Sequence, residues 1–416
     1  MTKPKIAFLC HFSSEEIRKR LDLNRYNLRK FLYGLKGGAA MYDDFAIWVS
    51  DYIAEFEKHP EIEFHIVAPH YGMKKDLQEF EKNGIHYHFF RWNYGIVYSL
   101  IEKIFNLYER SNFKRNRKKM TGIIKKMDPD LVVLCGAENP YYSIGVLDIQ
   151  DKPVYVILQT LLNDPARIEM GVGTPYKRKI ELDIFSHAKY FCAYSEKAVA
   201  KIREQNANAV FLPARFPTHQ PVVTIPPHKE YDFVFFARGV SKNKGIEDLL
   251  QALAIVKKNH SDVLLYVIGD CVVEYKRQLE ELIEKLGVLD NVVFAGYFLN
   301  IQDTFNHVVK AKNVVVPGIT AGLNSTVRES MFMGLPTICY ETNMTKPINN
   351  EKTCLLTARM GDIGDLAKKM QYALEKQNEM EVIGTNGKDY ANKTFSNEPI
   401  VNELLSNCRH IIEKKF

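Results

Sequence analysis

The stretch PGITAGLNSTVRESMFMGLP, residues 317–336, decides the fold because it joins two apolar strands through a helix that starts at a polar turn. The run NVVVP (313–317) leads into it, and PTICY (336–340) follows it. Both runs are apolar on both faces, as central parallel strands are when helices cover the two sides of a sheet. The stretch therefore predicts one β–α–β unit of a parallel sheet.

The same alternation of short apolar runs and helical stretches fills the rest of the chain. Strands are expected in the first half at 5–10, 63–69, 85–90, 131–136, 154–159, 189–194 and 209–213, with helices at 41–58 and 98–126. Further strands are expected in the second half at 232–237, 263–269 and 291–296. The two series predict an α/β protein with two Rossmann-like doubly wound domains facing a central cleft.

A proline-rich segment at 213–230 separates the two series and is interpreted as an interdomain linker, because five prolines resist helix and central strand. The first domain is expected at 1–215, completed by a C-terminal helix at 398–416, and the second at 229–397. In such sheets ligands bind beyond the carboxyl ends of the strands.

Composition and charge narrow the class of protein. The 416 residues carry a net charge of +6, and seven cysteines show neither Cys-x-x-Cys nor metal-ligand spacing, which favours a reduced cytoplasmic protein with no metal site. Eight Lys and Arg residues without an acid fill 110–126. This run is either a solvated helix face or a basic amphipathic helix that binds an anionic membrane surface, which would place the protein peripherally on the inner face of a membrane. No nucleic-acid motif accompanies it, so no nucleic-acid partner is expected.

Basic side chains stand at the carboxyl end of one expected strand. In FARGVSKNKGIEDLLQAL (235–252), Arg238 ends the strand and Lys244 lies in the loop before a helix. A guanidinium fork and an ammonium point charge together suit a diphosphate, although a basic surface loop would look the same. Gly269 ends the neighbouring run LYVIGD and permits close backbone approach.

The opening stretch supplies the matching half of this site. Gly318 and Gly322 leave room for the backbone, and Asn324, Ser325 and Thr326 stand at a helix start, where amide groups and the helix dipole favour an anion. Glu329 lies one turn further along, and its carboxylate can accept hydrogen bonds from sugar hydroxyls. The alternative is a capping box without a ligand.

Weaker candidates lie in the first half. Gly37 and Gly38 precede a helix and form either a second phosphate-facing helix start or a flexible turn. Glu138 and His11 each follow a strand, at the edge where ligands bind.

Taken together, these residues resemble the retaining glycosyltransferases of the GT-B fold, in particular family four (glycosyl transferases group 1). Arg238 matches the family's arginine, and Lys244-Gly245 matches its Lys-Gly, with five residues between instead of four. The family has two glutamates separated by seven residues, and Glu329 in VRESMFMGLP matches the second of them. Gly37-Gly38 matches the glycine pair of the family's first domain. Ala321 stands where the first glutamate is expected.

The resemblance implies a metal-independent, retaining hexosyltransferase that takes a UDP- or GDP-sugar as donor substrate, needs no other cofactor, and acts on a glycan or lipid-linked acceptor. Together with the strand-end positions described above, it makes Arg238, Lys244, Glu138 and His11 the catalytic candidates. The candidates for binding the nucleotide sugar are Gly37, Gly38, Gly269, Gly322, Asn324, Ser325, Thr326 and Glu329. Two alternatives stay open because of Ala321: a GT-B protein that binds nucleotide sugar without transferring it, and a nucleotide-sugar epimerase.

Overall fold

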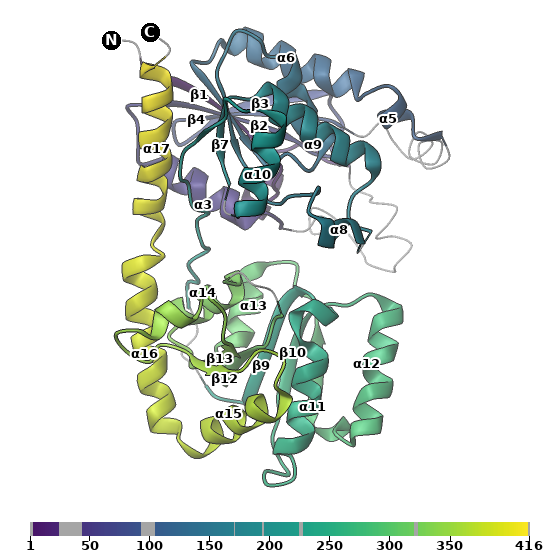
Figure 1. The fold of residues 1–416 in the computed structure, drawn as a ribbon, viewed down its shortest axis with the longest axis vertical. Coiled ribbons are helices and arrows are strands. Elements are labelled where there is room, and N and C mark those ends of the chain that lie inside the picture. Colours follow the sequence, from purple (N-terminus) through teal and green to yellow (C-terminus); the bar gives the residue numbers. More distant parts are fainter. Residues whose placement is uncertain are drawn as a thin grey trace. The chain divides into compact units, whose positions relative to one another are not determined.

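The computed structural model describes residues 3–24, 44–92, 105–169, 171–193, 195–223, 228–319 and 323–414. The chain forms two compact units (Figure 1). Unit 1 comprises Met1–Pro217 and Asn397–Phe416, and unit 2 comprises Thr218–Ser396. None of the described helices is both long and apolar enough to cross a membrane.

Unit 1 is built on a sheet of eight described strands in the order β3-β4-β2-β1-β5-β6-β7-β8. All neighbouring strands pair in parallel except β3 with β4, which is an antiparallel hairpin at one edge. The strands are β1 (Lys5–Leu9), β2 (Glu63–Pro69), β3 (Leu77–Lys82), β4 (Ile85–Phe90), β5 (Leu131–Cys135), β6 (Val154–Ile157), β7 (Tyr190–Cys192) and β8 (Val210–Phe211). β5, LVVLC, is buried throughout, as expected for a central strand covered on both faces.

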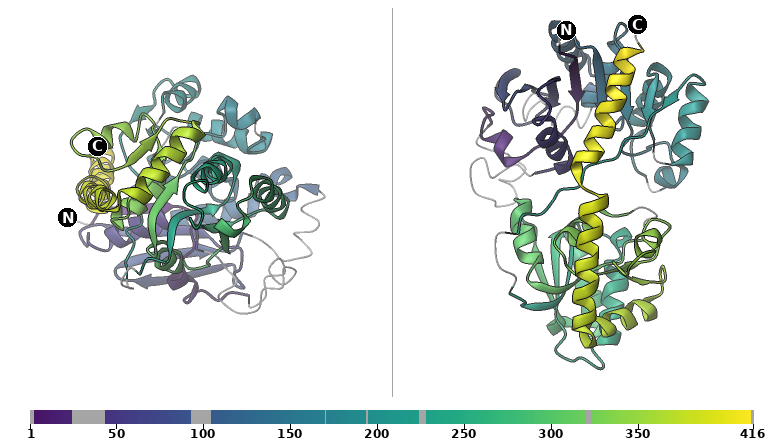
Figure 2. Two further views of the ribbon diagram at one scale, coloured as in Figure 1. Left: turned by 90° about the horizontal axis from the view of Figure 1, so that it is seen from below. Right: turned by 90° about the vertical axis from the view of Figure 1, so that its left-hand side faces the viewer.

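Helices cover both faces of this sheet, so unit 1 has two apolar cores. One core contains residues of α3 and α17, and the right-hand view of Figure 2 shows α17 lying along that face. The other core contains residues of α6, α9 and α10. The helices are α1 (Glu15–Arg18), α3 (Ile47–Phe56), α5 (Leu107–Arg110), α6 (Lys114–Met127), α7 (Pro140–Ser143), η2 (Ile144–Asp148), α8 (Pro165–Glu169), α9 (Pro175–His187), α10 (Glu196–Gln205) and α17 (Asn397–Glu413).

Unit 2 repeats the architecture with a wholly parallel sheet of six described strands in the order β11-β10-β9-β12-β13-β14. The strands are β9 (Tyr231–Gly239), β10 (Leu265–Asp270), β11 (Val292–Gly296), β12 (Ala311–Val316), β13 (Thr337–Tyr340) and β14 (Leu356–Ala358). The helices are η3 (Lys242–Lys244), α11 (Ile246–Val256), α12 (Val273–Leu286), η4 (Leu289–Asn291), α13 (Ile301–Val308), α14 (Ser325–Phe332), η5 (Lys346–Asn349), α15 (Ile363–Glu375) and α16 (Gln377–Thr394). One core contains residues of α11, α12 and α15, and the other contains residues of α13, α14 and α16.

Local sequence explains where several helices begin. The side chains of Thr174 before α9, Ser195 before α10 and Asp362 before α15 each accept a hydrogen bond from a backbone N–H of the first turn. Pro175 occupies the first turn of α9, where no N–H is needed. These caps fix the helix starts and therefore the loops that follow the strands.

The predicted α/β class with two doubly wound sheets is confirmed, with two differences. β3 and β14 were not among the expected strands. The prediction of a helical stretch at 98–126 is wrong for the described residues, because the helix is interrupted between α5 and α6. Asn112 and Phe113 adopt φ angles of 52° and 51° at this interruption. Phe113 is buried and stacks on Tyr108 with ring centroids 5.5 Å apart, which offsets the cost of the left-handed backbone.

Candidate functional site

Each sheet has a switch point, where neighbouring strands send their connections in opposite directions along the sheet. In unit 2 this point lies between β9 and β12, and in unit 1 it lies between β1 and β5. Ligands of doubly wound sheets bind beyond the carboxyl ends of the strands at such points. The residues that follow these four strands are therefore the candidate site residues.

In unit 2 the loop after β9 presents two predicted cations. Arg238 is exposed at the end of β9, and Lys244 is half-buried at the end of η3. The Ser241 hydroxyl donates to Asn243 Oδ1 at 2.5 Å, which orders the turn between them. Lys242, the third cation, is engaged elsewhere, since its Nζ lies 3.6 Å from Glu247 Oε2.

This loop packs against the turn that follows β12. Gly245 has a φ of +78°, and a Cβ atom there would lie 1.8 Å from the carbonyl oxygen of Pro317. The amide of Ile319 donates to the carbonyl of Asn243 at 3.2 Å. Only glycine permits this approach, so the Lys-Gly pair joins the loops that follow the two switch-point strands.

Gly269 at the end of β10 has a packing role. Its φ is +151°, and a Cβ atom there would lie 2.2 Å from the carbonyl oxygen of Ala237 on β9. The amide of Val240 donates to the carbonyl of Asp270 at 2.7 Å. Gly269 therefore holds the end of β9 in place, which is sufficient to explain a glycine there without a ligand contact.

The start of α14 lies beside the loop after β9. Asn324 is the N-cap residue with extended backbone and makes no side-chain capping bond to the described first turn. Ser325 is exposed, and Thr326 is half-buried. The first-turn amides and the positive end of the helix dipole thus form a site where an anion is stabilised.

The capping-box alternative is wrong. α14 begins at Ser325, so Val327 occupies the position where a capping box has Glu or Gln. Glu329 lies two residues further into the helix and is half-buried. Its carboxylate is therefore not explained by the need to cap this helix.

Some predicted site residues cannot be placed. Gly37, Gly38 and Gly322 lie outside the described residues, as does Ala321. Their roles stay predictions.

In unit 1 the structure brings His11 and Glu138 to the carboxyl ends of the adjacent strands β1 and β5. Tyr141 links this edge together, because its hydroxyl lies 2.7 Å from His11 Nδ1 and α7 begins two residues after Glu138. The His11 ring also lies edge-on to Tyr141, with centroids 5.0 Å apart.

Glu138 has a perturbed pKa. Burial raises the pKa of its carboxyl group to about 7, so that both protonation states are populated near neutral pH. In the amide orientation that satisfies both neighbours, Gln159 donates to Glu138 Oε1 at 2.9 Å and accepts from Trp48 Nε1 at 3.2 Å. Oε2 is buried without a hydrogen-bond partner among the described residues. A carboxyl group of this kind is suited to accept or donate a proton.

The histidines at this edge are neutral. Burial lowers the pKa of His11 to about 4, and burial followed by the nearby His11 and Arg18 lowers the pKa of His70 to about 3. The Nε2 atom of His11 is buried and has no partner in the described part of the chain. A neutral imidazole held by Tyr141 can donate or accept one hydrogen bond at that atom.

Sequence reasoning did not identify four residues at this edge: Trp48, His70, Tyr141 and Gln159. His70 directly follows the strand expected at 63–69 and Gln159 is the last residue of the strand expected at 154–159, so strand ends were the available signal. Ser13, two residues after His11, has a structural role, since its hydroxyl accepts a hydrogen bond from Arg18 Nη1 at 2.9 Å and the same guanidinium binds Asp44 at 2.7 Å.

A family comparison agrees with unit 2. Residues 221–390 match the model of the family described as glycosyl transferases group 1. The matched range contains Arg238, Lys244 and the start of α14, so the resemblance to glycosyl transferases group 1 is confirmed over this part of the chain. A comparison with curated protein sequences gives no match.

Solved structures share the fold of the whole chain at low identity. Sucrose-phosphate synthase from Thermosynechococcus elongatus is 14% identical with a TM-score of 0.67, over 99% of this chain and 100% of that one. HepE from Anabaena, in complex with UDP and glucose, is 14% identical with a TM-score of 0.61, over 98% of this chain and 100% of that one. A glycosyltransferase from Rickettsia africae is 14% identical with a TM-score of 0.61, over 99% of each chain. The fold is that of the GT-B glycosyltransferases.

Proposed function

We propose, from the match of residues 221–390 to glycosyl transferases group 1, that this protein transfers a hexose from a nucleotide-diphosphate sugar to a glycan or lipid-linked acceptor with retention. The observation that carries the proposal is the contact between the Lys244-Gly245 loop and the turn after β12. This contact holds two cations and a helix start on adjacent strand ends, an arrangement that suits a diphosphate.

Unit 2 would bind the donor. Arg238 and Lys244 would neutralise the diphosphate together with the first-turn amides of Asn324, Ser325 and Thr326. The carboxylate of Glu329 would accept hydrogen bonds from the two ribose hydroxyls. UDP in the HepE structure supports a uridine diphosphate sugar among the UDP- and GDP-sugars proposed as donors for this chain.

In the transfer step the bond between the sugar C1 and the diphosphate oxygen breaks, and a bond from C1 to the acceptor oxygen forms on the same face. The acceptor proton passes to the departing diphosphate, whose growing charge is stabilised by Arg238, Lys244 and the helix amides. Each preorganised donor of this kind is worth about 3 kcal/mol in transition-state stabilisation. These groups supply the positive charge, so we propose that the reaction is metal-independent.

Unit 1 would bind the acceptor at its own switch point. Glu138, with a pKa of about 7, can accept a hydrogen bond from an acceptor hydroxyl and so orient it near neutral pH. His11 can orient the same substrate through its unpartnered Nε2 atom. Both would be catalytic residues if they contact the reacting hydroxyl.

The test is release of nucleoside diphosphate from a panel of UDP- and GDP-sugars, with and without acceptor extracts. Lys244→Ala and Glu329→Ala are expected to lose binding and turnover, whereas Lys285→Ala, at an exposed lysine in the last turn of α12, is expected to retain both. Unchanged nucleotide affinity in both site variants would refute the donor site.

The sequence at Ala321 motivates a second candidate, a protein that binds nucleotide sugar without transferring it. Calorimetric binding without turnover on any acceptor would support this candidate. Conversion of the sugar in the absence of acceptor would instead identify an epimerase.

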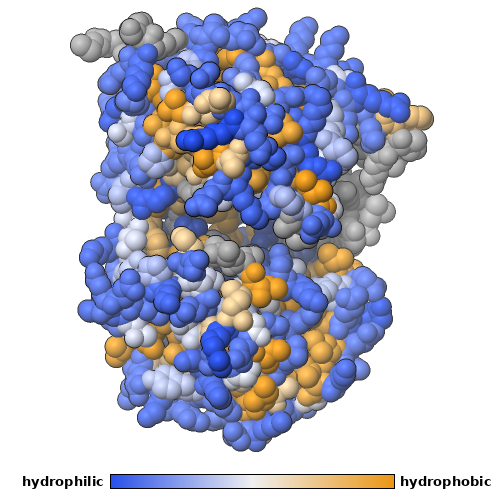
Figure 3. All heavy atoms as spheres, in the orientation of Figure 1, coloured by the Kyte–Doolittle hydropathy of each residue, from blue (hydrophilic) through white to orange (hydrophobic). Residues whose placement is uncertain are grey.

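The hypothesis that residues 110–126 bind an anionic membrane surface is restricted to binding by charge, without insertion of the helix into lipid. The apolar face of α6 (Met120, Ile123, Ile124 and Met127) is buried in the core, so it cannot insert into lipid. The outward face exposes Lys114, Lys118 and Lys125, and hydrophilic residues predominate at the top of Figure 3, where Figure 1 places α6.

We propose that this face adheres electrostatically to anionic lipid on the cytoplasmic side of a membrane. Low-salt co-sedimentation with anionic vesicles, lost in Lys114→Glu/Lys118→Glu/Lys125→Glu, would support adhesion. Equal sedimentation with neutral vesicles would contradict it.

A further inference from the structure

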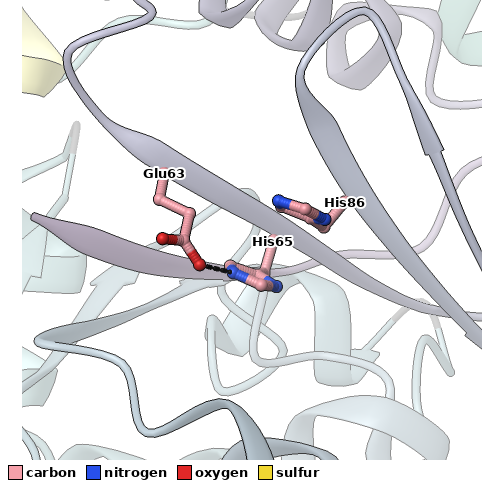
Figure 4. Close-up of side chains that lie close together, drawn as sticks. All are labelled: Glu63, His65 and His86. Atoms are coloured by element: carbon pink, nitrogen blue, oxygen red, sulfur yellow. Dashed lines mark hydrogen bonds and ion pairs between the residues drawn. The ribbon is translucent and has the colours of Figure 1, made fainter. Parts of the chain in front are cut away.

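Histidines and carboxylates cluster on one face of the unit 1 sheet, near the amino end of β2 and away from the edge that carries His11 and Glu138. His65 on β2 and His86 on β4 are direct partners across the parallel pair. Glu63 precedes His65 by two residues and so lies on the same face. Figure 4 shows the Glu63 carboxylate against the His65 ring, with the His86 ring alongside.

These side chains belong to a chain of contacts that crosses three strands. Glu63 Oε1 lies 2.8 Å from His65 Nε2, His65 Nδ1 lies 2.9 Å from His88 Nε2, and His88 Nδ1 lies 2.7 Å from Glu79 Oε1. Three hydrogen bonds need three protons. Two neutral imidazoles supply one N–H each, and the ionised carboxylates supply none.

One link in the chain therefore brings two lone pairs together unless a further positive species lies in it. If His88 donates to Glu79, then His65 donates to His88, and the bare Nε2 of His65 faces the Glu63 carboxylate. A proton would join only these two atoms. A metal ion joins three or four, and the ligand atoms of Glu63, His65 and His86 all lie within 4.8 Å of one another.

We propose that Glu63, His65 and His86 bind one divalent transition-metal ion, with Zn²⁺ the best match to a set of two imidazole nitrogens and one carboxylate oxygen. Zinc–ligand bonds of about 2.0 Å in tetrahedral geometry set ligand atoms about 3.3 Å apart. The Glu63–His65 pair therefore opens slightly and His86 moves inward. The His86 side chain is 37% exposed, which leaves it room to move, and water would complete the coordination.

Outer partners already orient the proposed ligands. His88, itself held by Glu79, engages Nδ1 of His65, and Glu81 Oε2 lies 3.8 Å from Nδ1 of His86. A hydrogen bond at the second ring nitrogen usually fixes the orientation of a metal-bound histidine, and the His65–His88 contact supplies one. Lys5 Nζ lies 3.5 Å from Glu63 Oε1 and would share that carboxylate with the ion. The bound ion would tie β2 to β4 beside the antiparallel edge, independently of the proposed sugar transfer.

The experiment uses the full chain, freed of metal by a chelator and then titrated with Zn²⁺ against a chromogenic competitor. One Zn²⁺ per chain is expected, with a rise in Tm on addition. His86→Gln and Glu63→Gln are expected to weaken binding more than about 100-fold, and the positioning variant His88→Gln about 10- to 100-fold. The matched control is His59→Gln, which removes another histidine paired with a carboxylate, 3.1 Å from Glu61 Oε1, but outside the cluster.

Co²⁺ gives a second readout, because tetrahedral Co²⁺ absorbs visible light strongly and water-coordinated Co²⁺ does so weakly. A visible spectrum in the wild type and in His59→Gln, lost in Glu63→Gln, supports the site even if His86→Gln folds poorly. Absence of stoichiometric Zn²⁺ binding, or equal binding by wild type, Glu63→Gln and His86→Gln, would overturn the proposal.

Discussion

Replacing Gly245 by alanine is expected to lower the stability of unit 2 and its affinity for a nucleoside diphosphate together. The left-handed backbone at φ +78° costs a non-glycine residue about 1 kcal/mol. The new Cβ would lie 1.8 Å from Pro317 O, whereas real Cβ atoms essentially never approach closer than 3.0 Å, so the backbone must move by at least 1.2 Å. Overpacking of this kind costs about 1–3 kcal/mol.

The combined loss is about 3 kcal/mol, or a fall in Tm of about 6–12 °C for a unit of this size. The same movement displaces Lys244, so affinity for UDP or GDP is expected to fall at least about tenfold, or 1.4 kcal/mol. Differential scanning calorimetry measures the first effect and titration calorimetry the second.

Two glycines of the same unit separate the causes. Gly287 shares the left-handed backbone, with φ +65°, but has nothing within 4 Å of a built Cβ, so Gly287→Ala is expected to lose only about 1 kcal/mol. Gly239 has open space and no left-handed backbone, so the change in Tm of Gly239→Ala measures the effect of replacing glycine by alanine without strain or a clash. If Gly245→Ala is no less stable than Gly287→Ala, the two loops do not meet and the donor site as described is wrong.

Three further outcomes are expected. Glu329→Gln should weaken nucleoside diphosphate binding by about 1.5–3 kcal/mol, and an unchanged Kd by calorimetry would exclude the ribose contact. The pKa of Glu138 is about 7 in the folded protein against 4.5 normally, so the contribution of this residue to stability falls as pH rises from 4.5 to 7. The urea midpoint of Glu138→Gln should therefore rise relative to that of the wild type over this pH range. A constant difference between the two midpoints would contradict the burial of Glu138. The pKa of His11 is about 4 in the folded protein against 6.5 normally, so the wild type loses stability as pH falls from 6.5 to 4. His11→Gln should lose less stability over that range, which urea midpoints measure.

The fold was largely predictable because central parallel strands are apolar on both faces. β5, LVVLC, and β12, AKNVVV, can be recognised on that ground alone. β3, LQEFEK, could not, because an edge strand alternates exposed and half-buried residues and resembles a surface loop. β14 has only three residues and carries too little pattern to separate it from a turn.

The donor side of the candidate site was predictable for a related reason. Arg238 stands at the end of one readable strand and Asn324 lies in the segment after another, and strand ends in parallel sheets converge. The side chains around Glu138 were not predictable, since the contact of Gln159 with Trp48 depends on tertiary packing between segments far apart in sequence. The histidine cluster escaped notice because His65, His86 and His88 look like the polar positions of alternating strands until β2, β4 and β3 are paired.

The return of α17 to unit 1 has a consequence for synthesis on the ribosome. Val401, Leu404, Leu405 and Ile411 belong to the first apolar core of unit 1 together with residues of β1 and α3. Unit 2 is one uninterrupted segment and can complete its core while translation continues. The residues of unit 1 that precede unit 2 must wait, with part of one face of their sheet uncovered, until α17 is made. Loss of the chain from residue 397 onward would therefore damage unit 1, although most of that unit precedes unit 2 in the sequence.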